Sequence, residues 1–268
     1  MDKRKVHAFS LFLLLLVILT ASSCSDVRSA YDKGNYRQVV TRISKMKNPS
    51  QSDLILKAKA YFALGEGERA LESLLLYLMS DESTQTPDDR SYAVGAFLSL
   101  GPSDSLVIMV LKPEDGYEAQ KALYRAYSRN DDTASARNIL TYLSEHLDFP
   151  SYVNLMFSAP SDPDFMLDTF AAWYSSIDDS ELDTYLSLLC RFSTEVAMGE
   201  GTAKKFLSLT DIMMNNLHYT ENDKNLSVLL KIKGNILDKL YDKVNARIYW
   251  TQAYRLNPED EELKGRQL

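Results

Sequence analysis

The amino-acid sequence predicts an all-α protein that is built from antiparallel helix pairs. Apolar residues recur at helical spacing along much of the chain, for example over residues 182–189. Clusters of turn-forming residues separate these periodic segments, among them 158–163, 177–180 and 199–201. No segment is convincing as a β-strand, because the one β-prone run, 107–111, falls where the second helix of a pair is due.

The first element is an amino-terminal leader, residues 1–23. A basic stretch at 1–5 precedes an apolar run at 11–19 and a group of small residues at 20–23. This order is typical of a cleavable secretory signal. The apolar core of about a dozen residues is shorter than the roughly 20 that span a bilayer. We therefore expect the leader to be removed after export.

Cys24 follows the leader directly, and residues 21–24 resemble the lipobox of bacterial lipoproteins. Ala21 stands where the family prefers leucine, a departure similar to the looser lipoboxes of spirochaetes and Bacteroides-type bacteria. The resemblance implies that Cys24 receives a diacylglyceryl group and anchors the chain in a membrane. Retention in the inner membrane requires aspartate directly after the lipidated cysteine. Ser25 stands at that position, which favours the outer membrane. The alternative is an ordinary secretory signal that happens to carry a cysteine.

The charge and the cysteine content limit the partners and the redox chemistry. The chain carries a net charge of −7, and loss of the leader, with three basic residues and one acid, leaves about −9. This excess of acid argues against a nucleic-acid partner and against a polybasic membrane-binding face. Cys24 and Cys190 are the only cysteines, so acylation of Cys24 excludes an internal disulfide. Cys190 lies in an apolar helical stretch, which predicts a buried, inert thiol; a reactive thiol is the alternative.

The clearest repeat begins at Gly234. Ala246, Trp250, Ala253 and Pro258 follow it by 12, 16, 19 and 24 residues. This spacing resembles that of a tetratricopeptide repeat. Small residues stand where two helices cross closely, a large aromatic residue fills the space between neighbours, and proline ends the second helix.

Weaker units with the same pattern occur at 30–43, 58–74 and 127–140. Anchor residues are spaced 31, 36 and 30 residues apart, which brackets the family period of about 34. These anchors are Val39, Ala70, Leu106 and Ala136.

The resemblance implies that residues 24–268 form one domain, a right-handed superhelix of antiparallel helix pairs (a tetratricopeptide-like α-solenoid). The length suits about fourteen helices in seven pairs. The middle region, 150–215, keeps the helical periodicity without the repeat pattern. An irregular helical-hairpin solenoid of another type is therefore the alternative.

No catalytic or metal-binding motif is present in the sequence. His146 and His218, the histidines of the mature chain, lie outside any metal-ligand spacing. The Gly-Glu-Gly runs at 65–67 and 199–201 fit turns better than phosphate-binding loops, because neither follows a strand. We therefore expect no enzyme activity, no metal and no cofactor.

The family resemblance also implies an extended concave face, lined mainly by the first helix of each pair, that binds a protein or peptide. Basic side chains there would bind carboxylates or carbonyl groups, and an aromatic ring would contact a peptide side chain. The candidate contact residues are Lys59, Phe62, Arg125, Arg129, Lys231, Asn235, Asp238 and Lys239. The alternative interpretation is that these residues form ordinary solvated helix faces.

Together these features predict a lipid-anchored protein-interaction scaffold of the cell envelope. The repeat pattern begins almost directly after Cys24, so we expect the domain to lie close to the membrane. The outer membrane is expected, with its periplasmic face favoured over the cell surface. The alternative is a surface-exposed lipoprotein that binds host or environmental ligands in the manner of an adhesin.

Overall fold

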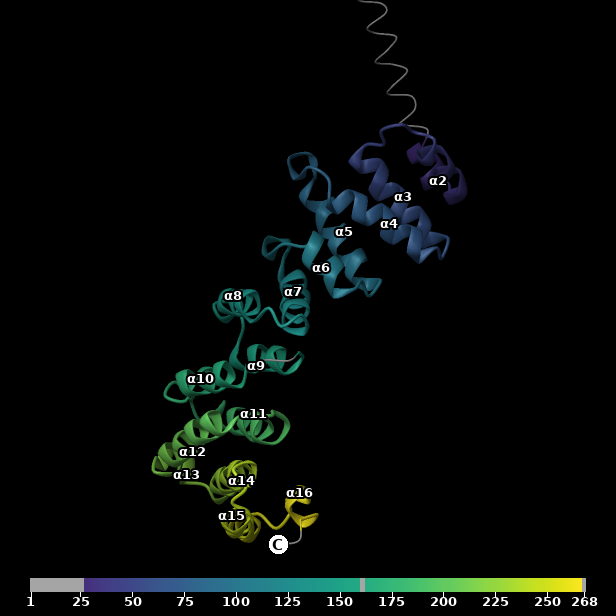
Figure 1. Ribbon diagram of the computed structural model, residues 1–268. Coiled ribbons are helices and arrows are strands. Elements are labelled where there is room, and N and C mark those ends of the chain that lie inside the picture. Colours follow the sequence, from purple (N-terminus) through teal and green to yellow (C-terminus); the bar gives the residue numbers. More distant parts are fainter. Residues whose placement is uncertain (1–26, 160–161, 267–268) are drawn as a thin grey trace, which may run out of the picture. The chain divides into compact units, whose positions relative to one another are not determined.

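Every regular element is helical in the computed structural model, which describes residues 27–159 and 162–266 (Figure 1). A helical segment at 27–32 comes first. The elements that follow are α2 (Tyr36–Ser44), α3 (Gln51–Ala63), α4 (Gly67–Leu78), the 3-10 turn η1 (Glu82–Thr84), α5 (Pro87–Ser99), α6 (Asp104–Val110), η2 (Pro113–Asp115), α7 (Tyr117–Arg129), α8 (Thr133–Ser144), α9 (Phe149–Phe157), α10 (Pro163–Trp173), α11 (Leu182–Glu195), α12 (Glu200–Met214), α13 (Leu217–Thr220), α14 (Asp223–Lys239), α15 (Lys243–Leu256) and α16 (Glu261–Lys264). The all-α prediction is confirmed, and the β-prone run 107–111 lies mostly in α6, as expected.

Fourteen longer helices lie in the described residues, which is the number of helices that the sequence predicts. The described residues divide into two compact units, and the division falls inside α7, between Ala126 and Tyr127. In unit 1, α3 packs on α4 and α2 packs on α3. In unit 2, α14 packs on α15, and the first helices α9, α11 and α14 contact one another in succession.

Four helix pairs are joined by the same tight turn. One residue in each turn has a positive φ angle: Gly34 (74°), Gly65 (73°), Asp131 (58°) and Tyr241 (62°). In each case the next amide donates to a carbonyl five residues back, as Asn35 does to Ala30 at 2.9 Å. This left-handed closing residue is the Schellman C-cap, which satisfies the last carbonyls of the first helix. The turn that the sequence predicts at 33–36 is confirmed.

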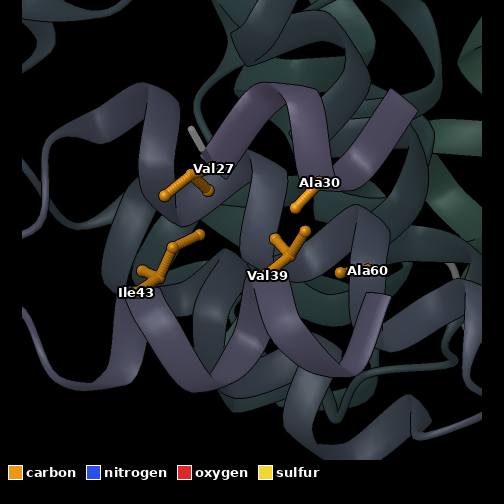
Figure 2. Packing of buried hydrophobic residues seen from close by; sticks show 5 residues of the cluster. All are labelled: Val27, Ala30, Val39, Ile43 and Ala60. Atoms are coloured by element: carbon orange, nitrogen blue, oxygen red, sulfur yellow. The ribbon is translucent and has the colours of Figure 1, made fainter. Parts of the chain in front are cut away.

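The core at the amino-terminal end of unit 1 joins three helical segments (Figure 2). Val27 and Ala30 come from the segment 27–32, Val39 and Ile43 from α2, and Ala60 from α3. All five are buried, Val39 completely. Three of them, Ala30, Val39 and Ile43, are repeat positions that the sequence analysis identified.

The last full pair has the close helix crossing that the tetratricopeptide resemblance predicts. Ala246 and Ala253 of α15 are fully buried, and the Trp250 side chain lies directly against Gly234 of α14. Small residues thus bring the two backbones together while the indole fills the space beside them. The chain has a tetratricopeptide-like, all-α fold.

The middle region packs through aromatic rings instead of small residues. The rings of Phe149, Phe170, Tyr185, Phe192 and Phe206 form a chain from α9 to α12, with neighbouring centroids 5.2 to 5.8 Å apart. Tyr185 also donates its hydroxyl proton to the carbonyl of Phe170 at 2.8 Å. Burial of large rings takes the place of the small-residue crossings, and the repeat spacing is lost although helix pairs persist.

The two Gly-Glu-Gly runs differ in structure. Gly65 lies in a turn, as expected. Gly199, in contrast, is the amino-terminal cap of α12, and residues 200–201 form the first turn of that helix. The predicted turn at 199–201 is therefore wrong for its last two residues, because glycine is also accepted at helix starts. The predicted turn-forming cluster at 177–180 is confirmed, since α11 begins just after it, at Leu182.

Candidate functional site

A hollow of about 510 Å³ opens on unit 2 between α11, α14 and the segment that carries α16; we call it the α14 hollow. Its floor is partly apolar, with Leu186, Cys190 and Val228. Charged side chains surround this floor. They are Asp183, Arg191, Glu195, Lys224, Lys231, Asp260 and Glu262.

Ion pairs hold the rim of the α14 hollow. Lys224 Nζ lies 2.7 Å from Asp183 Oδ2, which joins α14 to α11. Arg191 lies 2.7 Å from Glu195 on the same helix, and its guanidinium also covers the ring of Phe157 at 4.1 Å. Because these pairs are largely exposed, each adds little stability, on the order of 0.5 kcal/mol. Their side chains can exchange internal partners for a ligand at small cost.

Lys231 forms the most buried charge cluster of the site. Its Nζ lies 2.9 Å from Asp260 Oδ2 and 2.7 Å from Glu262 Oε2, while its own side chain is 10% exposed. Burial opposes the charge on Lys231, but the hydrogen bonds to Glu262 and Asp260 outweigh it, so the pKa of Lys231 is raised. Burial likewise opposes ionisation of the two carboxylates, and their bonds to Lys231 hold both pKa values below the usual range.

Asn225 is the unusual residue of the hollow. It lies in the first turn of α14 and is only 7% exposed. No hydrogen bond joins its side-chain amide to another of the described residues, although it lines the hollow. The amide atoms of Asn225 are not among the buried, unpartnered polar atoms of the described residues, so the amide is accessible from the hollow that it lines. An accessible amide without an internal partner can donate to a ligand and accept from it.

Cys190 contributes to the floor as a thiol, not as a thiolate. Burial raises its pKa to about 11, with Lys231 opposing that shift only in part. At neutral pH the sulfur is therefore protonated and weakly nucleophilic. This agrees with the inert thiol that the sequence predicts.

Of the four residues predicted on α14, the structure brings only Lys231 to the hollow. Asn235 is 4% exposed and uses its amide internally: it donates to Ser193 Oγ at 3.0 Å and accepts from Trp250 Nε1 at 3.0 Å. Asp238 pairs with Lys243 at 2.6 Å. Lys239 donates to the carbonyl of Val196 at 2.7 Å, just beyond the end of α11. These contacts hold α14 to its neighbours.

The predicted residues of the earlier repeats are not among the described residues that line the α14 hollow. Lys59 lines a smaller hollow of about 190 Å³ in unit 1, and its Nζ stacks over the ring of Tyr92 at 4.4 Å. Phe62 is half-buried on α3. Arg125 is half-buried and Arg129 exposed, both on α7. Contact between these residues and a partner stays a prediction.

Several residues of the hollow escaped the sequence analysis. Asp183, Ser187, Cys190 and Thr194 follow one another by four, three and four residues, which places them on one face of α11. Buried residues on the other side of the helix, such as Leu189, predict the helix itself but give no information on its polar face. A search for polar residues at helical spacing would have found this stripe.

Other expectations about the chain concern the anchor, membranes and metals. Cys24 lies outside the residues that the structure describes. Within the described residues, each helix is too short or too polar to serve as a bilayer span. The same residues contain no group of three or more histidine, cysteine, aspartate or glutamate side chains placed as metal ligands.

Comparison with solved structures finds similarity to the C-terminal part of a TPR repeat-containing protein from Cytophaga hutchinsonii, among others. That protein is 15% identical to this chain. The alignment covers 90% of this chain and 97% of that chain, with a TM-score of 0.29. No family model matches the sequence, and no curated protein matches it.

Proposed function

We propose that this chain is a lipid-anchored interaction module of the cell envelope that binds a segment of a partner protein in the α14 hollow. The observation that carries the proposal is the Asn225 amide, which lines the hollow and has no hydrogen-bond partner among the described residues. A side-chain amide offers one acceptor and two donors, the same groups that an extended peptide backbone requires.

The rest of the hollow fits such a segment. Val228 and Leu186 offer an apolar floor for a small side chain. The exposed ion pairs at the rim supply charges of both signs to a ligand that approaches from solvent. With a volume of about 510 Å³, the hollow is in the range of sites that bind a few residues of a peptide.

The anchor is the second part of the proposal. Acylation of Cys24 would hold the module at a membrane, where a partner in the same envelope is at high effective concentration. Few residues separate Cys24 from the helical segment that includes Val27. The proposed location is the periplasmic face of the outer membrane.

The binding site can be tested by photo-crosslinking in cells. A photo-reactive residue placed at Val228, inside the hollow, should capture one partner. The same residue at Ser208, exposed on α12, is the matched control. Loss of the Val228 adduct when Asn225 is changed to leucine would support the proposal. Equal adducts at both positions would contradict it.

The anchor is tested separately. Cys24→Ala should leave the leader uncleaved or release the protein from membranes. An unchanged membrane fraction together with normal processing would exclude lipidation at Cys24. Protease treatment of intact cells distinguishes the two faces, because degradation without disruption of the outer membrane indicates surface exposure.

A further inference from the structure

Helix α15 has two faces of opposite character. Ala246 and Ala253 are fully buried against α14. About half a turn away around the helix, Val244 is 74% exposed and Ile248 is 48% exposed. We call this outer surface the α15 face, defined by Val244, Arg247, Ile248, Thr251 and Arg255.

Within the described residues of unit 2, no element besides α15 lines the α15 face. The short helix α16 packs on the other side, where Leu263 is fully buried with Leu230 and Ala253. An open hollow of about 700 Å³ runs along the α15 face, and the described residues that line it all belong to α15. Two β-branched aliphatic side chains therefore remain in water beside a shallow depression.

The charge of the α15 face differs from that of the whole chain. The chain has a net charge of −7, yet the residues that line this hollow include three bases and no acid. Lys243 is paired with Asp238 at 2.6 Å. Arg247 and Arg255 are exposed, and no ion pair or hydrogen bond joins either side chain to another described residue.

These two guanidinium groups are exceptional in unit 2. The other lysines and arginines described there have partners, such as Lys204 with Glu200 and Lys233 with Asp211. Arg247 and Arg255 are eight residues apart, which corresponds to about 12 Å along a helix axis. Val244 and Ile248 lie beside them at helical spacing, so apolar and basic groups form one stripe.

We propose that the α15 face binds an acidic amphipathic helix of a partner protein. A helix fits this stripe because second helices of this fold already pack in this way: α10 contacts α12. Carboxylates about two turns apart on the partner would reach Arg247 and Arg255, and its apolar residues would cover Val244 and Ile248. This surface is distinct from the α14 hollow, since α15 contributes no residue to that site.

The test uses a fluorescent helical peptide whose leucine stripe is flanked by glutamates two turns apart. Binding to the purified mature chain is followed by fluorescence anisotropy. A peptide with glutamines in place of the glutamates is the charge control, and vesicles that contain anionic lipid are the second probe. The double variant Arg247→Glu/Arg255→Glu is compared with Lys204→Glu/Lys205→Glu, which makes the same charge change on the exposed surface of α12.

The acidic peptide should bind the wild-type chain and the α12 variant equally, and the α15 variant about tenfold or more weakly. The glutamine peptide should bind weakly to all three proteins, and added salt should weaken only the charge-dependent binding. Binding should persist in Asn225→Leu, which separates this surface from the α14 hollow. Equal binding of both peptides, or binding to the anionic vesicles without binding to the acidic peptide, would overturn the proposal.

Discussion

The indole of Trp250 occupies the space that a side chain at Gly234 would need. A β-carbon added at Gly234 would lie 2.4 Å from both Cδ1 and Nε1 of Trp250, and 3.1 Å from the carbonyl oxygen of Ala246. The indole is held on two sides, because Nε1 donates to Asn235 and the Arg266 guanidinium lies 4.0 Å from the ring centroid. The closest crossing of the last pair thus depends on this glycine.

Gly234→Ala should destabilise the protein by about 1–3 kcal/mol, because neither the indole nor the α15 backbone can move without loss of contacts. Gly95→Ala is the matched control: Gly95 is an exposed helical glycine with no atom near an added β-carbon. That variant should be more stable by about 0.5–1 kcal/mol through helix propensity alone. Urea unfolding measures both, and equal effects of the two substitutions would contradict the crossing argument.

The turn residue Tyr241 is expected to be a site of stored strain. It has a φ of 62° and is 88% exposed, so its ring contributes little packing. Tyr241→Gly should raise the free energy of unfolding by about 0.5–1 kcal/mol, because glycine adopts this conformation without a steric penalty. Gly65→Ala, at the equivalent turn, should lower it by about 1 kcal/mol. Thermal unfolding should show shifts of opposite sign.

The Lys231 cluster should make stability depend on pH. The lowered pKa values of Asp260 and Glu262 mean that their stabilisation is present above the ordinary carboxyl range and is lost as pH falls through the lowered values. The raised pKa of Lys231 means that its stabilisation is present below the ordinary lysine value and is lost as pH rises through the raised value. Stability from this cluster should therefore be level between about pH 5 and pH 10.

Lys231→Met should destabilise the neutral protein by about 1–3 kcal/mol, since two partly buried carboxylates lose their counter-charge. The variant should lose less stability than the wild type between pH 5 and pH 3. Glu262→Gln keeps the lysine and one carboxylate, so this variant should lose less stability at neutral pH than Lys231→Met. Unfolding curves at several pH values test this, and parallel pH profiles for wild type and Lys231→Met would contradict the assignment.

Asn225 and Asn235 should respond differently to the same substitution. Asn225→Leu removes an accessible amide that has no partner among the described residues, so stability should change by less than about 0.5 kcal/mol. Asn235→Leu breaks hydrogen bonds to Ser193 and Trp250 and should destabilise the protein by about 2–3 kcal/mol. Urea unfolding of the two variants separates them. Equal losses would show that Asn225 is a structural residue.

The sequence predicts the fold better than it predicts the site. Gly234, Trp250 and Ala253 were recognisable because helix crossings need a fixed combination of small and large residues at fixed spacing. The middle region lacks that combination, since rings such as Phe170 and Phe192 fill its helix interfaces. In that region, helical periodicity was sufficient to predict the helices, but it gave no information on the repeat units.

The site depends on partners that are distant along the chain. Asn235 was a reasonable groove residue by position, but Ser193, 42 residues earlier, takes up its amide. Asp260 is the N-cap of α16 and Glu262 lies within that helix, and sequence spacing does not show that this short helix returns to Lys231. Asn225 became a candidate only when its place in the hollow and its missing hydrogen bond were visible in three dimensions.

The repeated turn bears on which sequences can connect two helices. Its closing conformation is adopted by glycine at two positions, by aspartate at Asp131 and by tyrosine at Tyr241. A non-glycine residue there has a penalty of about 1–2 kcal/mol, which the rest of a helix pair can absorb. The turn therefore requires one backbone angle more than it requires one residue type. Helix pairs with different sequences can for this reason share the same connection.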